Sequence, residues 1–487
     1  MDLKPELDTN SDIPLFRQLA GHFKERIESL ELPPGHLLPS TRELADDLNL
    51  SRSTIVRCYE ELLAMGYLET IDGVGTFVNK AIPCLPQHWS TPTRTALTPS
   101  RYAQELFATT SRKLFAHDWK ELNFGCAPVD QLPIKQWRQL LLQHSRSLTE
   151  KKLDYGQAPF GFEPLRKSVK EYLARARSVR CDTEQIIVFP TSLYALHLVS
   201  QLLVDIDDHV VMSDPGFPYA RHTLKTRGAN MTFLPVDQSG MLVENLLELT
   251  QKPKIVYVNP SHQEPHGTLL SIDRRKTLLN FAHANDTLII EDDLDCQYRY
   301  TGVPAPSLQG LSESENVIYI GSFWKLLYPL VNVGYMVIPH SLIELFTHAW
   351  YLMYHTFHTQ IPILDQLALS DLLQDGHLER HIRKTGQIYA KRFQFLVHNL
   401  TIQMKSSVRI SPEGSGMHLT ARFLTDKSDL EIQEYAQEAN LPIVSTNVHY
   451  SGACVPGEFI IPFAHLSEKD IEQRVAKFAA LALGPVS

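Results

Sequence analysis

A single lysine lies inside an otherwise apolar stretch of this 487-residue chain. The stretch covers residues 320–329 and reads Ile-Gly-Ser-Phe-Trp-Lys-Leu-Leu-Tyr-Pro, with Lys325 as its one charged residue. Burying an ammonium group among apolar side chains is costly, and a buried lysine can become an amine nucleophile that forms Schiff bases. The alternative is a lysine whose head group reaches solvent from the end of a strand. The stretch alone leaves both interpretations open.

A second group of residues that could do chemistry lies near the N-terminus. Arg42, Arg52, Thr54 and Arg57 stand in or at the starts of segments with helical apolar spacing. Such residues could contact the phosphates and base edges of DNA. The alternative is a small three-helix domain with a solvated charged face. Residues 1–80 carry eight Lys and Arg against fourteen Asp and Glu, a formal charge of −6, so this local cluster would have to supply the phosphate contacts.

The elements that must position these arginines are three helices and a hairpin. Apolar spacing predicts helices over residues 14–30, 40–48 and 51–65. Ser40 and Ser51 stand where N-caps are expected. A hairpin is predicted around Asp72-Gly73. This order is that of a winged helix-turn-helix, in which the third helix enters the major groove by its N-terminal end.

The elements that position Lys325 follow a different pattern. Short apolar segments alternate with helical ones through the large C-terminal part, which predicts a mostly parallel α/β sheet with ligands at the carboxyl ends of its strands. Between the two parts, the stretch from residue 81 to about 110 contains four prolines and no sustained period, and we expect a linker there. The predicted domains are residues 1–80, a linker at 81–115, and residues 116–487.

Composition sets outer limits on function. A hydrophobic content of 43% and a net charge of −9 are ordinary for a globular protein and give no overall basic signature. The six cysteines are scattered, which favours reduced thiols over disulfides or a zinc site. The N-terminus has no apolar signal segment, and no run approaches 18 apolar residues. We therefore expect a cytoplasmic protein with no membrane partner.

The N-terminal motifs resemble the GntR family of bacterial DNA-binding domains. The resemblance covers residues 14–78 and is carried by Leu38-Pro39-Ser40-Thr41-Arg42, Ser51-Arg52-Ser53-Thr54-Ile55 and Gly73-Val74-Gly75-Thr76-Phe77. It implies that double-stranded operator DNA is the partner and that the wing glycine approaches the minor groove. The DNA-contacting residues that it implies are Arg42, Ser51, Arg52, Thr54, Arg57, Gly75 and Thr76.

The large part resembles the fold-type I aminotransferase-like domain of MocR-type regulators, which are regulators with a GntR-type head. The motifs that carry the resemblance are Asp214-Pro215-Gly216-Phe217-Pro218, Pro260-Ser261-His262-Gln263, Glu291-Asp292-Asp293, Gly321-Ser322-Phe323-Trp324-Lys325 and Gly376-His377-Leu378-Glu379-Arg380-His381. The resemblance covers about residues 123–483. It implies a fold-type I aminotransferase fold, pyridoxal 5'-phosphate (PLP) as cofactor and a homodimer.

The resemblance also implies a place for each cofactor-binding residue. Lys325 would form the Schiff base with PLP, and Asp292 would pair with the pyridine nitrogen and keep it protonated. Phe217 would stack on the cofactor ring. Ser192, at the start of a helix, and Ser322 would lie near the phosphate. The alternatives are a strand-end carboxylate that caps a turn for Asp292 and core packing for Phe217.

Several positions depart from the family pattern. Leu294 replaces a tyrosine that would bond the cofactor hydroxyl, and Asn332 replaces an arginine that would bind its phosphate. His266 and the stretch Thr191-Ser192-Leu193-Tyr194 are also unusual. Losing the arginine and tyrosine contacts would cost about 2–4.5 kcal/mol, or roughly 30- to 2,000-fold in affinity. Lys325 and the remaining phosphate donors could still hold the cofactor.

Two further patterns favour structural interpretations. His377 and His381 have the i, i+4 spacing of metal ligands, but no third ligand is evident, so we expect no metal. Aromatic and histidine residues at 350–358 favour packing at an interface: Trp350, Tyr351, Tyr354, His355, Phe357 and His358.

Three functions remain open at this point. We expect a DNA-binding transcriptional regulator that binds PLP through Lys325 and senses a small amine, amino acid or vitamer. The first alternative is a PLP-dependent aminotransferase with an accessory DNA-binding head. The second is a regulator with a cofactor-free sensor domain. The substitutions Leu294 and Asn332 weaken the case for catalytic turnover, so we expect sensing and not catalysis.

Overall fold

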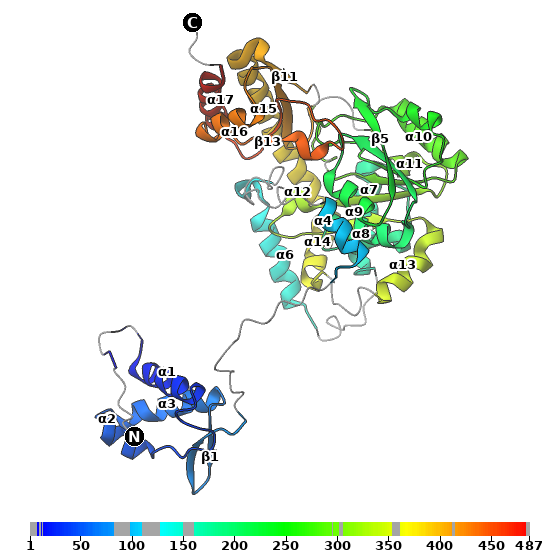
Figure 1. The fold of residues 1–487 in the computed structure, drawn as a ribbon. Coiled ribbons are helices and arrows are strands. Elements are labelled where there is room, and N and C mark those ends of the chain that lie inside the picture. Colours follow the sequence, from blue (N-terminus) through cyan, green and yellow to red (C-terminus); the bar gives the residue numbers. More distant parts are fainter. Residues whose placement is uncertain are drawn as a thin grey trace. The chain divides into compact units, whose positions relative to one another are not determined.

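The computed structural model describes residues 7–8, 11, 13–81, 98–109, 127–149, 160–294, 296–300, 305–352, 361–411 and 414–483. The chain divides into two compact units, Met1–Thr98 and Pro99–Ser487, and Figure 1 shows the elements of each. Each unit has its own hydrophobic core. We describe the two units separately.

The first unit is a winged helix-turn-helix, as predicted. Its elements are α1 (Leu15–Glu28), α2 (Thr41–Leu48), α3 (Arg52–Ala64), β1 (Leu68–Ile71) and β2 (Gly75–Val78). The i, i+4 apolar residues of α1 pack against α3, with Phe23 and Tyr59 in an edge-to-face contact at 6.2 Å between ring centroids. The wing is the antiparallel pair β1–β2.

Serine N-caps fix the starts of α2 and α3, the two helices that precede the wing. Ser40 accepts a hydrogen bond from the Glu43 amide, and the Glu43 carboxylate accepts one from the Ser40 amide, which completes the predicted capping box. Ser51 likewise accepts a hydrogen bond from the Thr54 amide at 3.2 Å. Gly66, with φ of +77°, follows the end of α3 and turns the chain toward β1.

The second unit is built on an eight-stranded sheet of order β3-β10-β9-β8-β7-β4-β5-β6. The five neighbouring strands from β9 to β5 are parallel, whereas β10 is antiparallel to both of its neighbours and β6 to β5. The mostly parallel sheet is confirmed. The strands are β3 (Ile186–Phe189), β4 (His209–Asp214), β5 (Asn230–Asp237), β6 (Gly240–Met241), β7 (Ile255–Val258), β8 (Leu288–Asp292), β9 (Val317–Ser322) and β10 (Gly334–Val337).

Helices cover both faces of this sheet because the buried strands are apolar on both sides. In β9, Tyr319 packs into the core shared with α7 and α14, whereas Ile318 and Ile320 pack into the core shared with α8, α9 and α13. Toward β4 and β5, the first of these faces is covered by α10 and α11. The helices are α6 (Ile134–Arg146), α7 (Glu163–Arg177), α8 (Ser192–Leu203), α9 (Pro218–Thr226), α10 (Ile272–Ala284), α11 (Leu308–Leu311), α12 (Trp324–Leu327), α13 (Ile343–Trp350) and α14 (Ile363–Gln374).

The C-terminal part of the second unit is a smaller α/β layer, coloured gold to red in Figure 1. Its four strands are antiparallel in the order β11-β12-β14-β13. The long helix α15 packs against α17, and α16 packs against α17 as well. The elements are α15 (His377–Met404), β11 (Val408–Ile410), β12 (His418–Phe423), α16 (Asp429–Glu438), β13 (Val444–Ser445), β14 (Glu458–Pro462) and α17 (Glu468–Leu483).

Short 3₁₀ turns complete the described chain. They are η2 (Val129–Gln131), η4 (Thr183–Gln185), η5 (Val243–Glu248), η6 (His340–Leu342), η8 (Lys405–Ser407) and η9 (Thr446–His449). No helix in the described part of the chain is long and apolar enough to cross a membrane. Within the same residues, no group of three or more His, Cys, Asp or Glu side chains is placed to hold a metal ion.

One helix lies where we predicted only linker. Helix α4 (Arg101–Thr109) belongs to the second unit and packs against α9. Its short apolar pattern, with Tyr102 and Leu106 four residues apart, was too brief to stand out among the neighbouring prolines. The domain boundaries at 80 and 115 stay predictions. The predicted interface residues Tyr354, His355, Phe357 and His358 lie outside the described residues.

Candidate functional site

The carboxyl ends of β8 and β9 bring the predicted lysine and carboxylate into one region. Asp292 ends β8 and pairs in register with Ile320 of the neighbouring β9. After β9 ends at Ser322, the chain turns directly into α12, and Lys325 is the second residue of that short helix. Both side chains are buried, with residue exposures of 9% for Lys325 and 4% for Asp292. Lys325 is therefore not the solvent-reaching lysine of the alternative interpretation.

Asp292 has one oxygen engaged and one available. The Tyr257 hydroxyl donates a hydrogen bond to Oδ2, and the Asn259 side-chain amide donates one to the Asp292 backbone carbonyl at 3.2 Å. Oδ1 is buried and has no hydrogen-bond partner among the described residues. Burial raises the pKa of Asp292 to about 7, while the Tyr257 hydrogen bond acts in the opposite direction. A buried, unpartnered acceptor fits a ligand with a protonated ring nitrogen.

The neighbouring Asp293 has the opposite environment. Arg177 lies 2.6 Å from one of its oxygens, and the Tyr319 hydroxyl donates to the same oxygen at 2.6 Å. Ser261 also contacts the Arg177 guanidinium, at 2.5 Å. Although burial acts to raise it, this ion pair holds the pKa of Asp293 below its usual range. The Arg177–Asp293 ion pair thus holds the end of β8, and Asp292 takes no part in it.

A second carboxylate faces the lysine, and the sequence analysis did not predict it. Glu264 Oε1 lies 3.9 Å from Lys325 Nζ, and the two side chains are 12% and 10% exposed. Glu264 belongs to the loop between β7 and α10. The Gln263 side-chain amide fixes this loop by donating to the carbonyls of Pro215 and Glu264, both at 2.5 Å. Tyr257 and Asn259 were also missed, because their contacts with Asp292 cross between strands.

The predicted phosphate-site residues converge from three elements. Gly334 of β10 pairs with Ser322 of β9, and a Cβ atom at Gly334 would lie 2.3 Å from the Ser192 amide nitrogen. The buried start of α8 therefore meets the end of β9, where helix amide groups can bind an anion. Asn332, two residues before Gly334, has a buried Oδ1 with no hydrogen-bond partner in the described chain. Ser322 itself accepts a hydrogen bond from the Trp324 amide at 3.0 Å.

The remaining predicted cofactor residue, Phe217, packs into the core. It precedes α9, and its ring lies 5.5 Å from that of Tyr219 and against the core shared by α8 and α13. Core packing, the alternative interpretation, is thus part of what Phe217 does. Stacking on a cofactor stays a prediction.

Two of the unusual positions have defined surroundings. Leu294 is half-buried in the turn after β8 and supplies no hydroxyl there. His266 lies 3.2 Å from the Glu458 carboxylate at the start of β14, and the Tyr450 hydroxyl donates to the same carboxylate at 2.9 Å. Although burial acts to raise it, these partners hold the pKa of Glu458 below its usual range. His266 therefore ties the loop that carries Glu264 to the C-terminal sheet.

The predicted DNA-contacting residues lie at the start of α2, in the first half of α3 and on the wing of the first unit. Arg42, Arg52 and Arg57 are exposed. Thr54 shares a hydrogen bond with Ser51 at 2.8 Å between the two hydroxyl oxygens, so both serve the cap of α3. The Arg57 guanidinium lies 5.7 Å from the centre of the Phe16 ring of α1. Arg42 and Arg52 carry no such contact among those that the structure describes.

The wing residues have a specific backbone. Gly75 has φ of +145°, and a Cβ atom there would lie 2.8 Å from the Leu37 side chain. That contact is with the end of an exposed, flexible side chain, so the positive φ is the stronger reason for a glycine here. Thr76 pairs with Thr70 across the hairpin. The predicted wing position is thus held by a glycine for steric reasons that are independent of DNA.

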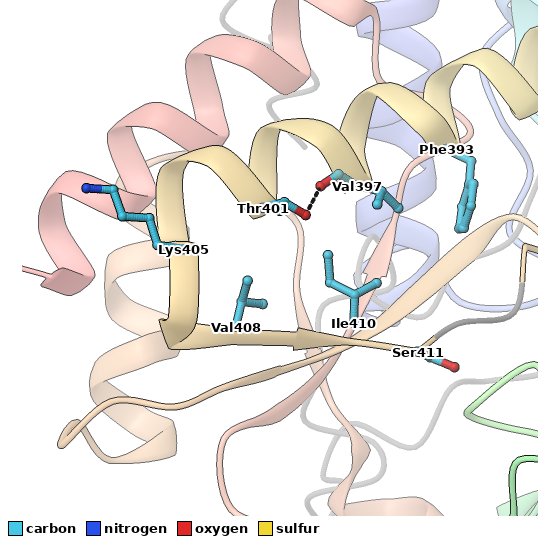
Figure 2. A pocket seen from close by; sticks show the side chains of 7 residues that line it. All are labelled: Phe393, Val397, Thr401, Lys405, Val408, Ile410 and Ser411. Atoms are coloured by element: carbon cyan, nitrogen blue, oxygen red, sulfur yellow. Dashed lines mark hydrogen bonds between the residues drawn. The ribbon is translucent and has the colours of Figure 1, made fainter.

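Two cavities in the second unit are lined by other side chains. Figure 2 shows one, of about 280 Å³, between the end of α15 and the edge strand β11, where Val408 and Ile410 lie opposite Val397. The other, of about 440 Å³, is lined mainly by α9 and β5 residues, including Arg221 and Lys225. None of the predicted cofactor residues lines either cavity.

The predicted histidine pair has structural contacts. His377 shares a hydrogen bond with Gln136 of α6 at 2.9 Å, and burial lowers the pKa of His381. Trp350 of the aromatic stretch packs in the core against Phe160 and Phe189. Trp350 therefore serves the core and Tyr351 is exposed, while packing of this stretch at an interface stays a prediction.

Comparison with known proteins covers nearly the whole chain. Residues 15–78 match the family model of the bacterial regulatory proteins of the gntR family, and residues 120–478 match aminotransferase class I and II. The chain is 30% identical over 480 residues to the uncharacterized HTH-type transcriptional regulator YdeL of Bacillus subtilis, covering 99% of both chains. It is 33% identical over 432 residues to the probable rhizopine catabolism regulatory protein MocR of Rhizobium meliloti, covering 88% of this chain and 86% of the relative.

The second unit also resembles solved enzymes in its fold. The kynurenine aminotransferase of Pyrococcus horikoshii superposes with a TM-score of 0.67 at 24% sequence identity, covering 77% of this chain and 96% of that chain. The two family matches, in this order on one chain, account for both described units. The protein belongs to the MocR subfamily of GntR-type DNA-binding transcriptional regulators, in which a helix-turn-helix domain is joined to an aminotransferase class I and II domain.

Proposed function

We propose that the aminotransferase-like unit binds pyridoxal 5'-phosphate through Lys325 and that its occupancy, together with a small amine, amino acid or vitamer, controls DNA binding by the first unit. The observation that carries the proposal is the unpartnered Asp292 Oδ1, buried at the end of β8 next to the strand that leads to Lys325. Such an oxygen is costly to leave unpaired. A protonated pyridine nitrogen would satisfy it.

Each residue of the site has a defined task in this proposal. Lys325 supplies the amine, and Asp292, oriented by Tyr257, accepts the hydrogen bond of the ring nitrogen. The amide groups at the start of α8, with Ser192, face the phosphate. PLP, when bound, supplies an aldehyde that reacts reversibly with amines and a ring that withdraws electrons. A sensor needs the reversible amine chemistry but no turnover.

The site also supports sensing over catalysis. The half-buried Leu294 supplies no hydroxyl to the cofactor, and Asn332 supplies no cation to its phosphate. We infer that the cofactor is held less tightly than in a catalytic aminotransferase, which suits a regulator that responds to cofactor or amine supply. Effector binding can shift DNA binding only if the effector has different affinities for two states of the protein.

The DNA-binding side of the proposal rests on the first unit. Arg42 and Arg52 are exposed at the starts of α2 and α3, where an inserted recognition helix presents its N-terminal residues. We propose that α3 enters the major groove of an operator in the cytoplasm and that the wing around Gly75 contacts the minor groove. A homodimer would place two such heads on two half-sites.

Absorbance spectroscopy tests the cofactor proposal. Titration of the purified protein with PLP should produce a visible band that saturates, and Lys325→Ala should abolish this band. Lys276→Ala, which removes an exposed lysine of α10, is the matched control and should leave the band unchanged. Identical spectra for the wild type and Lys325→Ala would reject Lys325 as the attachment site.

A turnover assay separates the sensor from an enzyme. We expect no sustained transfer of amino groups between amino acids and 2-oxo acids when the PLP-loaded protein is assayed with excess substrates. Many turnovers per minute would favour an aminotransferase with an accessory DNA-binding head instead.

A further inference from the structure

Glu264 has an unusual position for a carboxylate. Its Oε1 lies 3.9 Å from Lys325 Nζ, and both side chains are about nine-tenths buried. The Gln263 hydrogen bonds to Pro215 and to the Glu264 carbonyl hold the backbone there, and the Gly267 amide closes the loop on the Gln263 carbonyl at 2.7 Å. The carboxylate is thus presented to the lysine by a fixed loop.

We propose that Glu264 is the counter-ion of Lys325, which keeps the lysine nitrogen protonated and sets the pH above which its amine reacts with a carbonyl compound. The inference rests on the proposed function where it concerns PLP, but the ion pair itself does not need the cofactor. It assigns a task to a residue that the family motifs did not single out.

Two opposing effects act on the protonation of Lys325. Burial favours a neutral amine, whereas an opposite charge within about 4–6 Å favours the ammonium form. The 3.9 Å between Glu264 Oε1 and Lys325 Nζ lies within this range. The Glu264 carboxylate therefore favours the ammonium form and opposes the effect of burial.

The other titratable groups around the pair act in known directions. From β8, Asp292 is a second carboxylate. Burial is the largest cause of its raised pKa, and the negative charge of Glu264 raises it further. From β7, the Tyr257 hydroxyl is committed to Asp292, and its pKa is raised well above the usual range, chiefly by burial. From α15, His381 contacts the backbone of Leu326, and burial lowers the pKa of His381. Lys325 in turn acts to lower the pKa of Asp292, so both carboxylates act on the lysine, and Glu264 Oε1 lies 3.9 Å from its nitrogen.

The reaction of Lys325 with an aldehyde then has a defined proton path. An ammonium has no lone pair, so its proton must first pass to the Glu264 carboxylate, which becomes a carboxylic acid. The amine nitrogen forms a bond with the aldehyde carbon, and the aldehyde oxygen leaves as water. The proton returns from Glu264 to the imine nitrogen, and the regenerated carboxylate stabilises that positive charge. No oxidant, reductant or other reactant is needed.

The first experiment uses the cofactor-free protein. The rate at which an amine-reactive acetylating reagent labels Lys325 is measured against pH by peptide mass spectrometry, in the wild type and in Glu264→Gln. We expect the pH midpoint of labelling to fall by about 1–3 units in Glu264→Gln, because the neutral amide no longer stabilises the ammonium. An unchanged midpoint would overturn the proposal.

Two further variants keep this test decisive. Asp371→Asn removes a partly buried carboxylate of α14 that pairs with His144 of α6 at 2.8 Å, and it should leave the Lys325 midpoint where it is. Glu264→Asp keeps the charge but moves it away, so its midpoint should lie between those of the wild type and Glu264→Gln. If Glu264→Gln does not fold, as judged by circular dichroism, the labelling midpoint of Glu264→Asp tests the proposal. A midpoint equal to that of the wild type would then reject the ion pair.

The second experiment adds PLP and follows the visible band against pH. In Glu264→Gln the band should change to that of an unprotonated imine at a pH about 1–3 units lower than in the wild type. If neither protein shows a band, the proposed function fails while the labelling result still decides the ion pair. If both show a band that titrates at the same pH, Glu264 is not the counter-ion.

Discussion

The adjacent carboxylates Asp292 and Asp293, at the end of β8, have pKa values shifted in opposite directions by their surroundings. Asp293 is committed to Arg177 and Tyr319, and its pKa lies below the usual range. Among the described residues, Asp292 has no cationic partner within hydrogen-bonding distance and keeps one oxygen unpaired, and burial raises its pKa to about 7. Asp293 is therefore held by structural contacts, whereas Asp292 is the carboxylate that we propose to bind the cofactor.

The raised pKa of Asp292 predicts a dependence of stability on pH in the cofactor-free protein. The folded chain keeps this proton up to a pH of about 7, whereas an unfolded chain loses it near pH 4, so Asp292 destabilises the fold as pH rises through this window. Asp292→Asn cannot ionise at this position, and it should gain stability relative to the wild type between pH 5 and pH 8, by at most about 3 kcal/mol. Urea unfolding at the two pH values measures this difference.

The Asp292→Asn comparison has a built-in control. Glu291 is also buried, and its pKa is raised to about 7, but both proteins share it, so it cancels in the difference. Unfolding curves whose separation is the same at pH 5 and pH 8 would contradict the protonation that we assign to Asp292.

Asn332 offers a test of the phosphate side. Its Oδ1 is buried without a partner in the described chain, two residues before Gly334, which meets the start of α8. Restoring a cation by Asn332→Arg should tighten PLP binding by about 1.5–3 kcal/mol, or roughly 10- to 150-fold, because a charge-assisted hydrogen bond to the phosphate replaces none. Asn332→Ala is the control, and it should not tighten binding. A PLP affinity that is equal in all three proteins would place the phosphate elsewhere.

At the level of single residues, sequence motifs predicted Lys325 and Asp292 but not Glu264. The first two occupy recognisable places after strands. Glu264 lies 61 residues before Lys325, and nothing in the spacing of the two residues predicts a 3.9 Å approach. Its position depends on a loop held by Gln263, whose contacts cross to the segment after β4.

At the level of elements, helical and strand periodicity placed most of the structure that carries the site. The helices predicted over residues 14–30, 40–48 and 51–65 are observed as α1, α2 and α3, and the predicted alternation of apolar and helical segments is observed as the mostly parallel sheet with its helices. Buried apolar strands and amphipathic helices leave a strong pattern. Helix α4 and the one-turn helix α12 were not predicted, because helices this short hold too few apolar residues to show a period.

Helix α3 carries the prediction that concerns DNA. Arg52→Ala should weaken binding to a duplex selected by the protein from a random pool by about 1–3 kcal/mol, or roughly 5- to 150-fold. Lys24→Ala is the matched control, because this exposed lysine lies on α1 and pairs with Glu28. Fluorescence anisotropy at fixed salt measures both. Equal losses in the two variants would argue against the docking of α3 by its N-terminal end.

At the level of the whole molecule, the two units must be coupled for the protein to act as a sensor. Coupling free energies between sites are typically 1–3 kcal/mol. PLP should therefore change the affinity of the wild type for the selected duplex by about 5- to 150-fold, and it should have no effect on Lys325→Ala. Unchanged DNA affinity on PLP addition would separate cofactor binding from regulation.

The order of the two units along the chain was predictable, whereas their coupling was not. Each unit has local motifs and its own core, so sequence patterns are sufficient to identify both. Coupling depends on differences in affinity between states of the protein, which neither motifs nor packing within one unit reveal.

Covalent trapping tests the central claim most directly. The protein is incubated with PLP, reduced with sodium borohydride and digested, and the peptides are analysed by mass spectrometry. Our account predicts a phosphopyridoxyl group on Lys325 at near-unit occupancy, lost in Lys325→Ala and retained in Lys276→Ala. An unmodified Lys325 peptide, with label spread over exposed lysines or absent, would contradict it.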